Sequence, residues 1–431
     1  MTDLSDNNNY FSRLMKNPLA CIGKWRWTSI HLQMGYSRSC YRTDEDHFTE
    51  ETVDQFHNLP LQLETRQQML DGKWPGKGCE YCKNLESVGA ISNRLIFNHE
   101  SYKGNVPKEL LTNNRAVKVT PTMIEISLGN LCNMSCIYCG PTYSSIWEAE
   151  MIKQPDDDLR EPEKLFDTAT YYRVVDRFFL WLDANIGDLR DIHILGGEPT
   201  LQPELLRLIE LLETNPNVRL DSFMVVTNLK LPRSKLEMIA NRLEKLIDSA
   251  RIKEVVINAS LDCWGPQQEY IRTGLKLAQF EENLAYLVRT HPRLFIDIHG
   301  TITALTIRTM PKLMERINYY NSVREGNKVI FNCNFLSRYE YLHPESFPSG
   351  FYDQDFEAIY AELNKIEDQR TRDKIIEVMN GYQKFINVRP YNPAAITKMK
   401  SVLDKLDMRR GTSWRPLFPW IDEFDETSYV E

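Results

Sequence analysis

The sequence predicts an α/β protein whose central part is a partial (β/α)6 TIM-like barrel. Six short apolar runs alternate with helical patterns between residues 123 and 335, which is typical of parallel β/α units. A Cys- and Trp-rich region precedes this alternation, and residues 351–431 show mainly helical patterns. We therefore expect three parts, a cysteine-rich region at 1–110, the barrel at 111–340 and a helical extension at 341–431.

Each element of the expected barrel follows from the local pattern. Apolar runs predict strands at 123–128, 192–195, 223–227, 255–261, 294–303 and 329–335. Leu205, Leu208, Ile209 and Leu212 repeat at helical spacing behind Pro203. Further helices are predicted at 171–182, 235–247, 280–289, 311–320, 356–366, 372–385 and 394–406. Six units are two fewer than a closed eight-fold barrel needs, so the periodicity also leaves a doubly wound sheet open.

The composition narrows the class of protein. The chain has 431 residues and a formal net charge of -8, which argues against a protein that coats nucleic acid by neutralising phosphates. No apolar run is long enough to span a bilayer. The first twenty residues, which include Asn7–Asn9 and no continuous apolar stretch, predict no secretory signal. We therefore expect a cytoplasmic location, where clustered thiols indicate metal rather than disulfides.

Three cysteines follow the first predicted strand of the barrel. Cys132, Cys136 and Cys139 have a Cys-x3-Cys-x2-Cys spacing that should arise by chance only about 0.004 times in such a chain. They lie at the carboxyl end of a strand, where β/α proteins build active sites. A cubane iron–sulfur cluster held by three thiolates keeps one iron open for another ligand. A zinc site, which takes four protein ligands when structural, is the alternative.

This cysteine motif, with Tyr138 before its last member, resembles the signature of the radical S-adenosylmethionine (SAM) superfamily. Ile194-Leu-Gly-Gly-Glu-Pro199 resembles the family's segment that contacts the methionyl amino group of SAM, where the glycines allow close backbone approach and Glu198 offsets the ammonium. Ser260-Leu-Asp262 resembles the ribose and carboxylate motif, and Arg272 the arginine that faces the SAM carboxylate. The resemblance implies a catalytic [4Fe–4S] cluster on the three cysteines. It also implies SAM contacts from Tyr138, Gly196, Gly197, Glu198, Pro199, Thr227, Asn228, Ser260, Asp262 and Arg272.

A second group of cysteines precedes the barrel and comprises Cys21, Cys40, Cys79 and Cys82. On chemistry alone, four thiolates suit a structural zinc ion and a four-Cys cubane equally. Residues 21–100 resemble the N-terminal segment of twitch-domain radical SAM proteins, in which this region binds an auxiliary [4Fe–4S] cluster. That family often has two adjacent cysteines where this chain has Ser39 and Cys40, so Cys40 is assigned by position.

The remaining candidates have plainer interpretations. We expect His31 to be packed and hydrogen-bonded rather than a ligand. Cys263 ends a strand near the expected SAM site and could donate a hydrogen atom, but a buried, inert thiol is the expected state of both Cys263 and Cys333. The segment at residues 409–414 resembles the end of twitch-family chains, and the sequence explains no role for it.

The resemblance implies an oxidoreductase-type enzyme that reductively cleaves SAM to a 5′-deoxyadenosyl radical, which abstracts hydrogen from a substrate. Similar proteins modify peptides and proteins, sugars or nucleotides. A peptide or protein side chain is the favoured substrate here, with a sugar or nucleotide as the alternative. The implied electron donor is a flavodoxin or ferredoxin, and no membrane or nucleic-acid partner is expected. Two competing hypotheses are a zinc-stapled scaffold without catalytic activity and a non-radical SAM-dependent transferase.

Overall fold

The computed structural model of the chain describes residues 10–76, 78–100, 103–156, 159, 166–336 and 338–424. The Asn7–Asn9 run named above lies outside the described residues. In the described part of the chain, no helix is long and apolar enough to cross a membrane.

The strands form one sheet in the order β3-β2-β1-β4-β5-β6-β7-β8-β9. Strands β4 to β6 and β7 to β9 pair in parallel. From β4 to β9 the spatial order follows the chain order, whereas a doubly wound sheet reverses its order at a switch point. The sheet is therefore that of a partial barrel. The bounds are β4 Met123–Ser127, β5 Asp191–Leu195, β6 Leu220–Thr227, β7 Ile252–Ser260, β8 Phe295–Ile302 and β9 Val329–Phe335.

Three further strands belong to the N-terminal region and were not predicted from the sequence: β1 Trp27–His31, β2 Tyr36–Arg38 and β3 Asp46–His47. Strand β1 pairs in parallel with β4, and β2 and β3 continue antiparallel from it. All five residues of β1 are buried, so its sequence lacks the apolar–polar alternation of a half-buried strand. The cysteine-rich region thus extends the barrel sheet at the β4 edge.

The chain divides into two compact units. Unit 1 comprises Met1–Leu131, Glu163–Val225 and Lys245–Val255, and unit 2 comprises Cys132–Pro162, Val226–Glu244 and Val256–Glu431. Strands β6 and β7 contribute residues to both. The division therefore falls within β6 and β7. The boundaries expected near residues 110 and 340 stay predictions.

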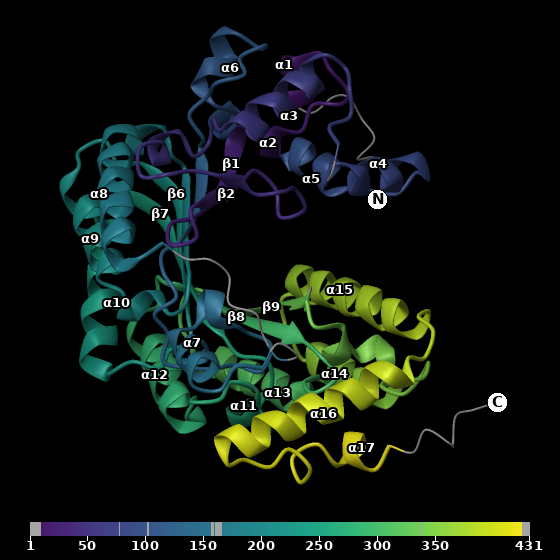
Figure 1. Cartoon of the computed structure of the whole chain (residues 1–431). Coiled ribbons are helices and arrows are strands. Elements are labelled where there is room, and N and C mark those ends of the chain that lie inside the picture. The colour runs from purple at the N-terminus through teal and green to yellow at the C-terminus, as the bar shows by residue number, and fades with distance from the viewer. Residues whose placement is uncertain are drawn as a thin grey trace. The chain divides into compact units, whose positions relative to one another are not determined.

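Unit 1 contains an N-terminal group of short helices and two long barrel helices. The short helices are α1 Tyr10–Met15, α2 Ile22–Arg26, α3 Pro60–Leu70, α4 Glu80–Ser87, α5 Asn93–Glu100 and α6 Lys108–Thr112. Phe11, Trp25, Met69 and Leu110 belong to one apolar core, which joins α1, α2, α3 and α6. The long helices α8 Thr168–Asn185 and α9 Pro203–Thr214 cover one face of the sheet, as Figure 1 shows.

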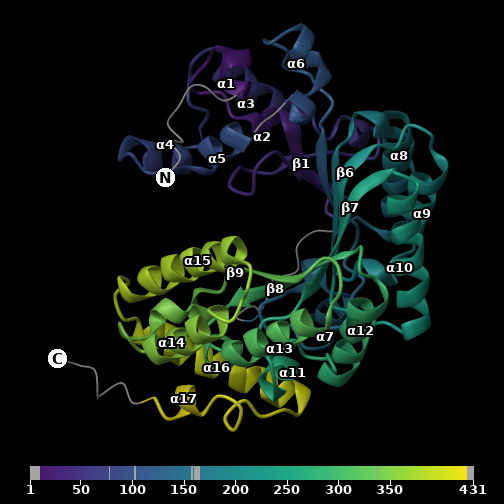
Figure 2. The same ribbon diagram turned by 180° about the vertical axis from the view of Figure 1, so that it is seen from behind.

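Unit 2 contains the later barrel helices and the C-terminal extension. In Figure 2, α13 and α14 lie side by side next to β9. The predicted helices of both the barrel and the extension are all present. Their bounds, with three that were not predicted (α7, α11 and α17), are α7 Ser145–Lys153, α10 Arg233–Asp248, α11 Pro266–Ile271, α12 Leu277–Thr290, α13 Met310–Val323, α14 Asp353–Leu363, α15 Gln369–Asn387, α16 Pro393–Arg410 and α17 Pro419–Asp422.

Candidate functional site

The loop from Cys132 to Cys139 is held by hydrogen bonds to its backbone. Its amides at Ser135 and Ile137 donate to the carbonyls of Thr273 and Ile271, at 2.9 and 2.8 Å. The indole of Trp147 donates to the Cys136 carbonyl at 2.8 Å. These bonds to backbone groups fix the path of the loop.

The three thiols of this loop interact electrostatically. Cys136 is buried, while Cys132 and Cys139 are half-buried. Burial raises the pKa of the Cys136 thiol, the Arg272 guanidinium lowers it, and the charges of Cys139 and Cys132 raise it further. Cys132 and Cys139 are therefore each in electrostatic range of Cys136, and so is the Arg272 guanidinium. Thiolates are the ligands of iron–sulfur clusters, and bound iron would relieve their mutual repulsion, so the donor set fits a cluster.

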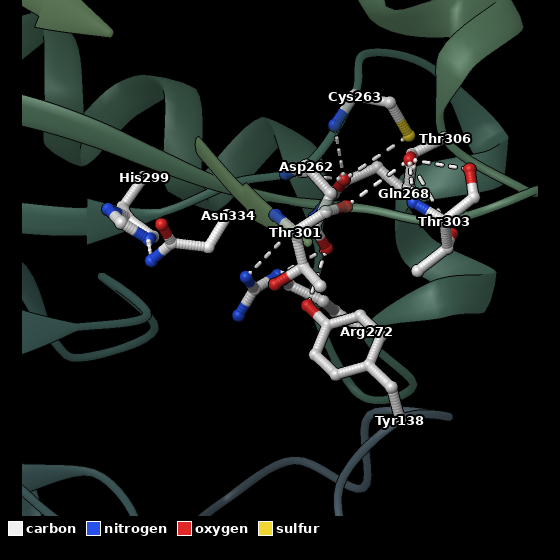
Figure 3. Close-up of polar contacts among 10 residues, drawn as sticks. All are labelled: Tyr138, Asp262, Cys263, Gln268, Arg272, His299, Thr301, Thr303, Thr306 and Asn334. Carbon is white, nitrogen blue, oxygen red and sulfur yellow. Dashed lines mark hydrogen bonds and ion pairs between the residues drawn. The ribbon is translucent and has the colours of Figure 1, made fainter. Parts of the chain in front are cut away.

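A buried ion pair lies beside this loop. Arg272 donates from Nε and Nη2 to the two carboxylate oxygens of Asp262, both at 2.8 Å, and the Tyr138 hydroxyl donates to Asp262 Oδ2 at 2.6 Å. The Thr301 amide donates to Asp262 Oδ1 at 2.8 Å. Figure 3 shows Tyr138, Arg272 and Thr301 gathered around this carboxylate. Asp262 is fully buried, so it is a positioning anchor for Arg272 and Tyr138.

Sequence reasoning had expected Arg272 to face the SAM carboxylate, and the structure adds Asp262 as its partner. Within the described part of the chain, Arg272 Nη1 makes no hydrogen bond. One edge of the guanidinium is thus fixed by Asp262, while Nη1 is available to a second anion. The same carboxylate fixes Tyr138, whose ring lies 5.6 Å from the guanidinium carbon.

Cys263, the next residue after Asp262, is buried, as the sequence predicts. Its sulfur is fully buried and lies 3.3 Å from Gln268 Oε1, which also accepts from the Cys263 amide at 2.9 Å (Figure 3). Burial raises the pKa of this thiol. Cys333 on β9 is also buried, with Met379 at 3.8 Å.

Residues that follow β6 form hydrogen bonds with Asn133 in the cysteine loop. The Asn228 amide donates to Asn133 Oδ1 at 2.9 Å, and Lys230 Nζ donates to the Asn133 carbonyl at 2.9 Å. Thr227 Oγ1 accepts from the amide of Leu229, which has a positive φ of 53°. Thr227 and Asn228 therefore shape this turn and fix the start of the cysteine loop.

In unit 1, Gly196 to Pro199 lie against the residues that precede Cys132. The Gly197 amide donates to the Gly129 carbonyl and the Glu198 amide to the Leu131 carbonyl, both at 2.8 Å. Glu198 is buried, and its Oε1 accepts from the amide and the hydroxyl of Thr200 at 3.1 and 2.6 Å. The glycines were expected to permit close approach of a ligand. In unit 1 they permit close approach of another stretch of backbone.

We expect Gly197→Ala to destabilise the protein by about 1–3 kcal/mol, because its methyl group would lie 2.5 Å from the Leu131 carbonyl oxygen and 2.7 Å from that of Asn130. Thermal unfolding and iron content after reconstitution measure the effect. Gly381→Ala on helix α15 is the matched control, since a Cβ there meets no atom within 4 Å. Equal stability of the two variants would contradict the prediction.

Comparison with known protein families gives a match in the middle of the chain. Residues 126–317, which contain the cysteine loop, the Gly196–Pro199 segment and the Asp262–Arg272 pair, match the radical SAM superfamily. The chain contains a radical SAM domain. No curated protein matches the chain.

Two solved structures are similar to parts of the chain. Native anSMEcpe with bound AdoMet matches at 15% identity and a TM-score of 0.35, over 63% of this chain and 64% of its own. The hexahistidine-tagged form of anSMEcpe with bound AdoMet matches at 16% identity and a TM-score of 0.33, over 57% and 59%. The chain thus spans less than two thirds of either solved chain, and the superfamily assignment rests on the sequence match.

The four N-terminal cysteines also interact within unit 1. Burial raises the pKa of Cys21 to about 12, Lys24 lowers it, and Cys40 and Cys79 raise it further. Burial likewise raises the pKa of Cys79, and the charges of Cys40 and Cys82 add to this. All four sulfurs are therefore within electrostatic range of at least one other. Among the described residues, no three His, Cys, Asp or Glu side chains form a geometry ready for a single metal ion.

Gly78 helps to bring these cysteines together. It has a positive φ of 89°, and a Cβ at this position would collide with the Arg42 carbonyl. The turn before Cys79 therefore packs directly on the turn that follows Cys40. His31, by contrast, stacks on Tyr36 with ring centroids 4.3 Å apart, which agrees with the packed role expected for it.

The C-terminal segment that the sequence left without a role braces the cysteine loop of the radical SAM domain. The Arg410 guanidinium lies 4.5 Å from the centroid of Trp147, the residue whose indole holds Cys136, and donates to Glu150 at 3.0 Å and to Thr273 Oγ1 at 3.1 Å. Gly411 ends helix α16 in the left-handed conformation. Only the fold shows that the extension supports this loop.

The sheet carries polar side chains that sequence reasoning missed. In unit 2, Asp297 accepts from the amides of Asn258 and Asn332 at 2.8 and 2.9 Å, and His299 contacts Asn334 at 3.0 Å. In unit 1, the buried Glu125 accepts from Ser29 at 2.9 Å and from the hydroxyl of Tyr41. A period-two pattern of polar residues along β7 to β9 was the available signal.

Proposed function

We propose that this protein is a twitch-branch radical SAM enzyme that cleaves SAM reductively and abstracts hydrogen from a substrate. The observation that carries the proposal is the group of three thiols at Cys132, Cys136 and Cys139 next to the buried Asp262–Arg272 pair, within a domain that matches the superfamily. Cys132, Cys136 and Cys139 would hold a [4Fe–4S] cluster, which would supply the one-electron chemistry for reductive cleavage of SAM.

The residues of the chain would bind SAM and orient the cysteine loop. Arg272 stabilises the thiolate form of Cys136 by its charge, and Asp262 holds the guanidinium in place. We assign the SAM carboxylate to Arg272 Nη1 and the methionyl ammonium to Glu198, with further contacts from Tyr138, Gly196, Gly197, Pro199, Thr227, Asn228 and Ser260. Trp147 and the backbone of residues 271–273 keep the cysteine loop in one conformation, so the sulfurs need little reorganisation on binding iron.

The favoured substrate is a peptide or protein side chain. A peptide offers amide and carbonyl groups for hydrogen bonding, and the choice rests on the resemblance to radical SAM proteins that modify peptides, because the polar groups around Asp297 already hydrogen-bond to one another. A sugar or a nucleotide offers similar groups and stays the alternative. Incubation with SAM and each substrate class, followed by measurement of 5′-deoxyadenosine and of the substrate mass, distinguishes them.

We assign an auxiliary [4Fe–4S] cluster to Cys21, Cys40, Cys79 and Cys82. A flavodoxin or ferredoxin is the proposed electron donor, and the cytoplasm is the proposed location, since thiolate-bound clusters require reduced cysteines. A zinc ion on the four N-terminal thiols is the competing assignment.

Anaerobic reconstitution tests both sites at once. We expect a brown protein with about eight irons, equal to two cubanes. The double variant Cys79→Ser/Cys82→Ser should retain about four irons and still cleave SAM. A colourless protein loaded with zinc would refute the radical assignment and favour the zinc-stapled scaffold.

A further inference from the structure

Lys24 on helix α2 has a buried side chain. Its side chain is only 3% exposed, and within the described part of the chain its ammonium makes no hydrogen bond. Burying an ammonium costs several kcal/mol unless an anion or a set of acceptors compensates for it. The residues on either side of it in the helix, Gly23 and Trp25, are also buried, and Trp25 belongs to the apolar core of this region.

Cys21 lies directly before the helix that carries Lys24, and Cys79 belongs to the same apolar core as Trp25, against which Cys21 also packs. The charge of Lys24 lowers the pKa of both thiols. These two cysteines come from different segments, since Cys21 precedes α2 and Cys79 precedes α4. The Lys24 amide also donates to the Cys21 carbonyl at 3.0 Å, which fixes the start of its helix next to the thiol.

Arg94 is a second cation near Cys79, and it differs from Lys24 in having hydrogen-bond partners. Arg94 also lowers the pKa of Cys79, but it donates to Glu86 Oε1 at 2.9 Å and to the Pro18 carbonyl at 2.6 Å. Its charge is already balanced by Glu86 within the protein. Lys24 has no such carboxylate bonded to it among the described residues, so its charge can act on the thiols of Cys21 and Cys79.

We propose that Lys24 is the counter-ion and hydrogen-bond donor of the cluster on Cys21, Cys40, Cys79 and Cys82, and that it raises the reduction potential of that cluster. The inference rests on the auxiliary cluster of the proposed function. Four thiolates and a cubane carry a net negative charge that grows by one on reduction. A buried cation stabilises the reduced state more than the oxidised state, and the net charge and the hydrogen bonds to sulfur set the potential.

The test is a redox titration of the reconstituted protein followed by electron paramagnetic resonance. Lys24→Met keeps the length and packing of the side chain and removes its charge, while Lys24→Arg keeps the charge. Lys83→Met is the matched control, because Lys83 is exposed on α4 next to Cys82 and its charge is screened by water. The signal of the catalytic cluster, identified by its change on adding SAM, is the internal reference.

We expect the auxiliary potential to shift to a more negative value in Lys24→Met and to stay near the parent value in the other two variants. The catalytic cluster should not shift in any of them. Selective loss of the auxiliary cluster in Lys24→Met, with iron falling to about four, would also support the counter-ion role. An unchanged potential in Lys24→Met, with about eight irons retained, would overturn the inference alone. Zinc in the N-terminal site of the parent protein would overturn the auxiliary cluster and this inference together.

Discussion

Cys136→Ala should abolish 5′-deoxyadenosine formation and lower the iron content from about eight to about four. Cys136 is the buried member of the three thiols, and the Trp147 indole donates a hydrogen bond to its carbonyl. Without it, a cubane would keep only two protein ligands in this loop. The measurements are iron content and the 5′-deoxyadenosine released from SAM under a strong reductant.

Cys333→Ala is the matched control for this variant. Cys333 is also buried in unit 2, but its sulfur contacts Met379 and lies among core residues of β9 and α15. Its removal should cost stability and leave iron content and SAM cleavage intact. Full turnover of Cys136→Ala would contradict the radical mechanism and favour a non-radical SAM-dependent transferase, which needs no open iron.

The sequence predicted the elements whose pattern is local. Strand β9 has the predicted bounds, and β4 to β8 and the helices between them differ by a few residues at their ends. Hydrophobic periodicity specifies these elements because one side of each packs on its neighbour. The cysteine motif could be recognised because Cys132, Cys136 and Cys139 lie within eight residues of one another, and their role as cluster ligands stays a prediction.

The contacts that complete the site join residues distant in the chain, and the sequence could not predict them. Asp262 and Arg272 were both chosen as candidates, yet nothing in their spacing shows that they pair. The brace from Arg410 to Trp147 joins residues 263 positions apart (410 minus 147). Lys24 resembles any lysine of an amphipathic helix until its burial is known. Such pairings depend on packing between elements, which a local pattern does not encode.

Asp262→Asn should destabilise the protein by about 3–5 kcal/mol, because it leaves the Arg272 guanidinium buried without its counter-charge. Side chains in this pair are 0% and 9% exposed, so water cannot replace the lost carboxylate. Asparagine also has one acceptor oxygen where aspartate has two. Its NH2 group cannot accept the hydrogen bonds that the replaced carboxylate oxygen accepts. Thermal and denaturant unfolding of the whole protein measure the loss, and SAM affinity should fall with it as Arg272 loses its fixed orientation.

Asp176→Asn is the matched control, since Asp176 pairs with Arg207 at 2.5 Å on the surface, where ion pairs contribute about 0–1 kcal/mol. The double variant Asp262→Asn/Arg272→Met removes both charges and should recover part of the stability, with a coupling of about 1–3 kcal/mol between the two sites. It should not recover SAM affinity, because the residue assigned to the SAM carboxylate is gone. Recovery of both would show that Arg272 acts only in folding and would remove it from the proposed SAM site.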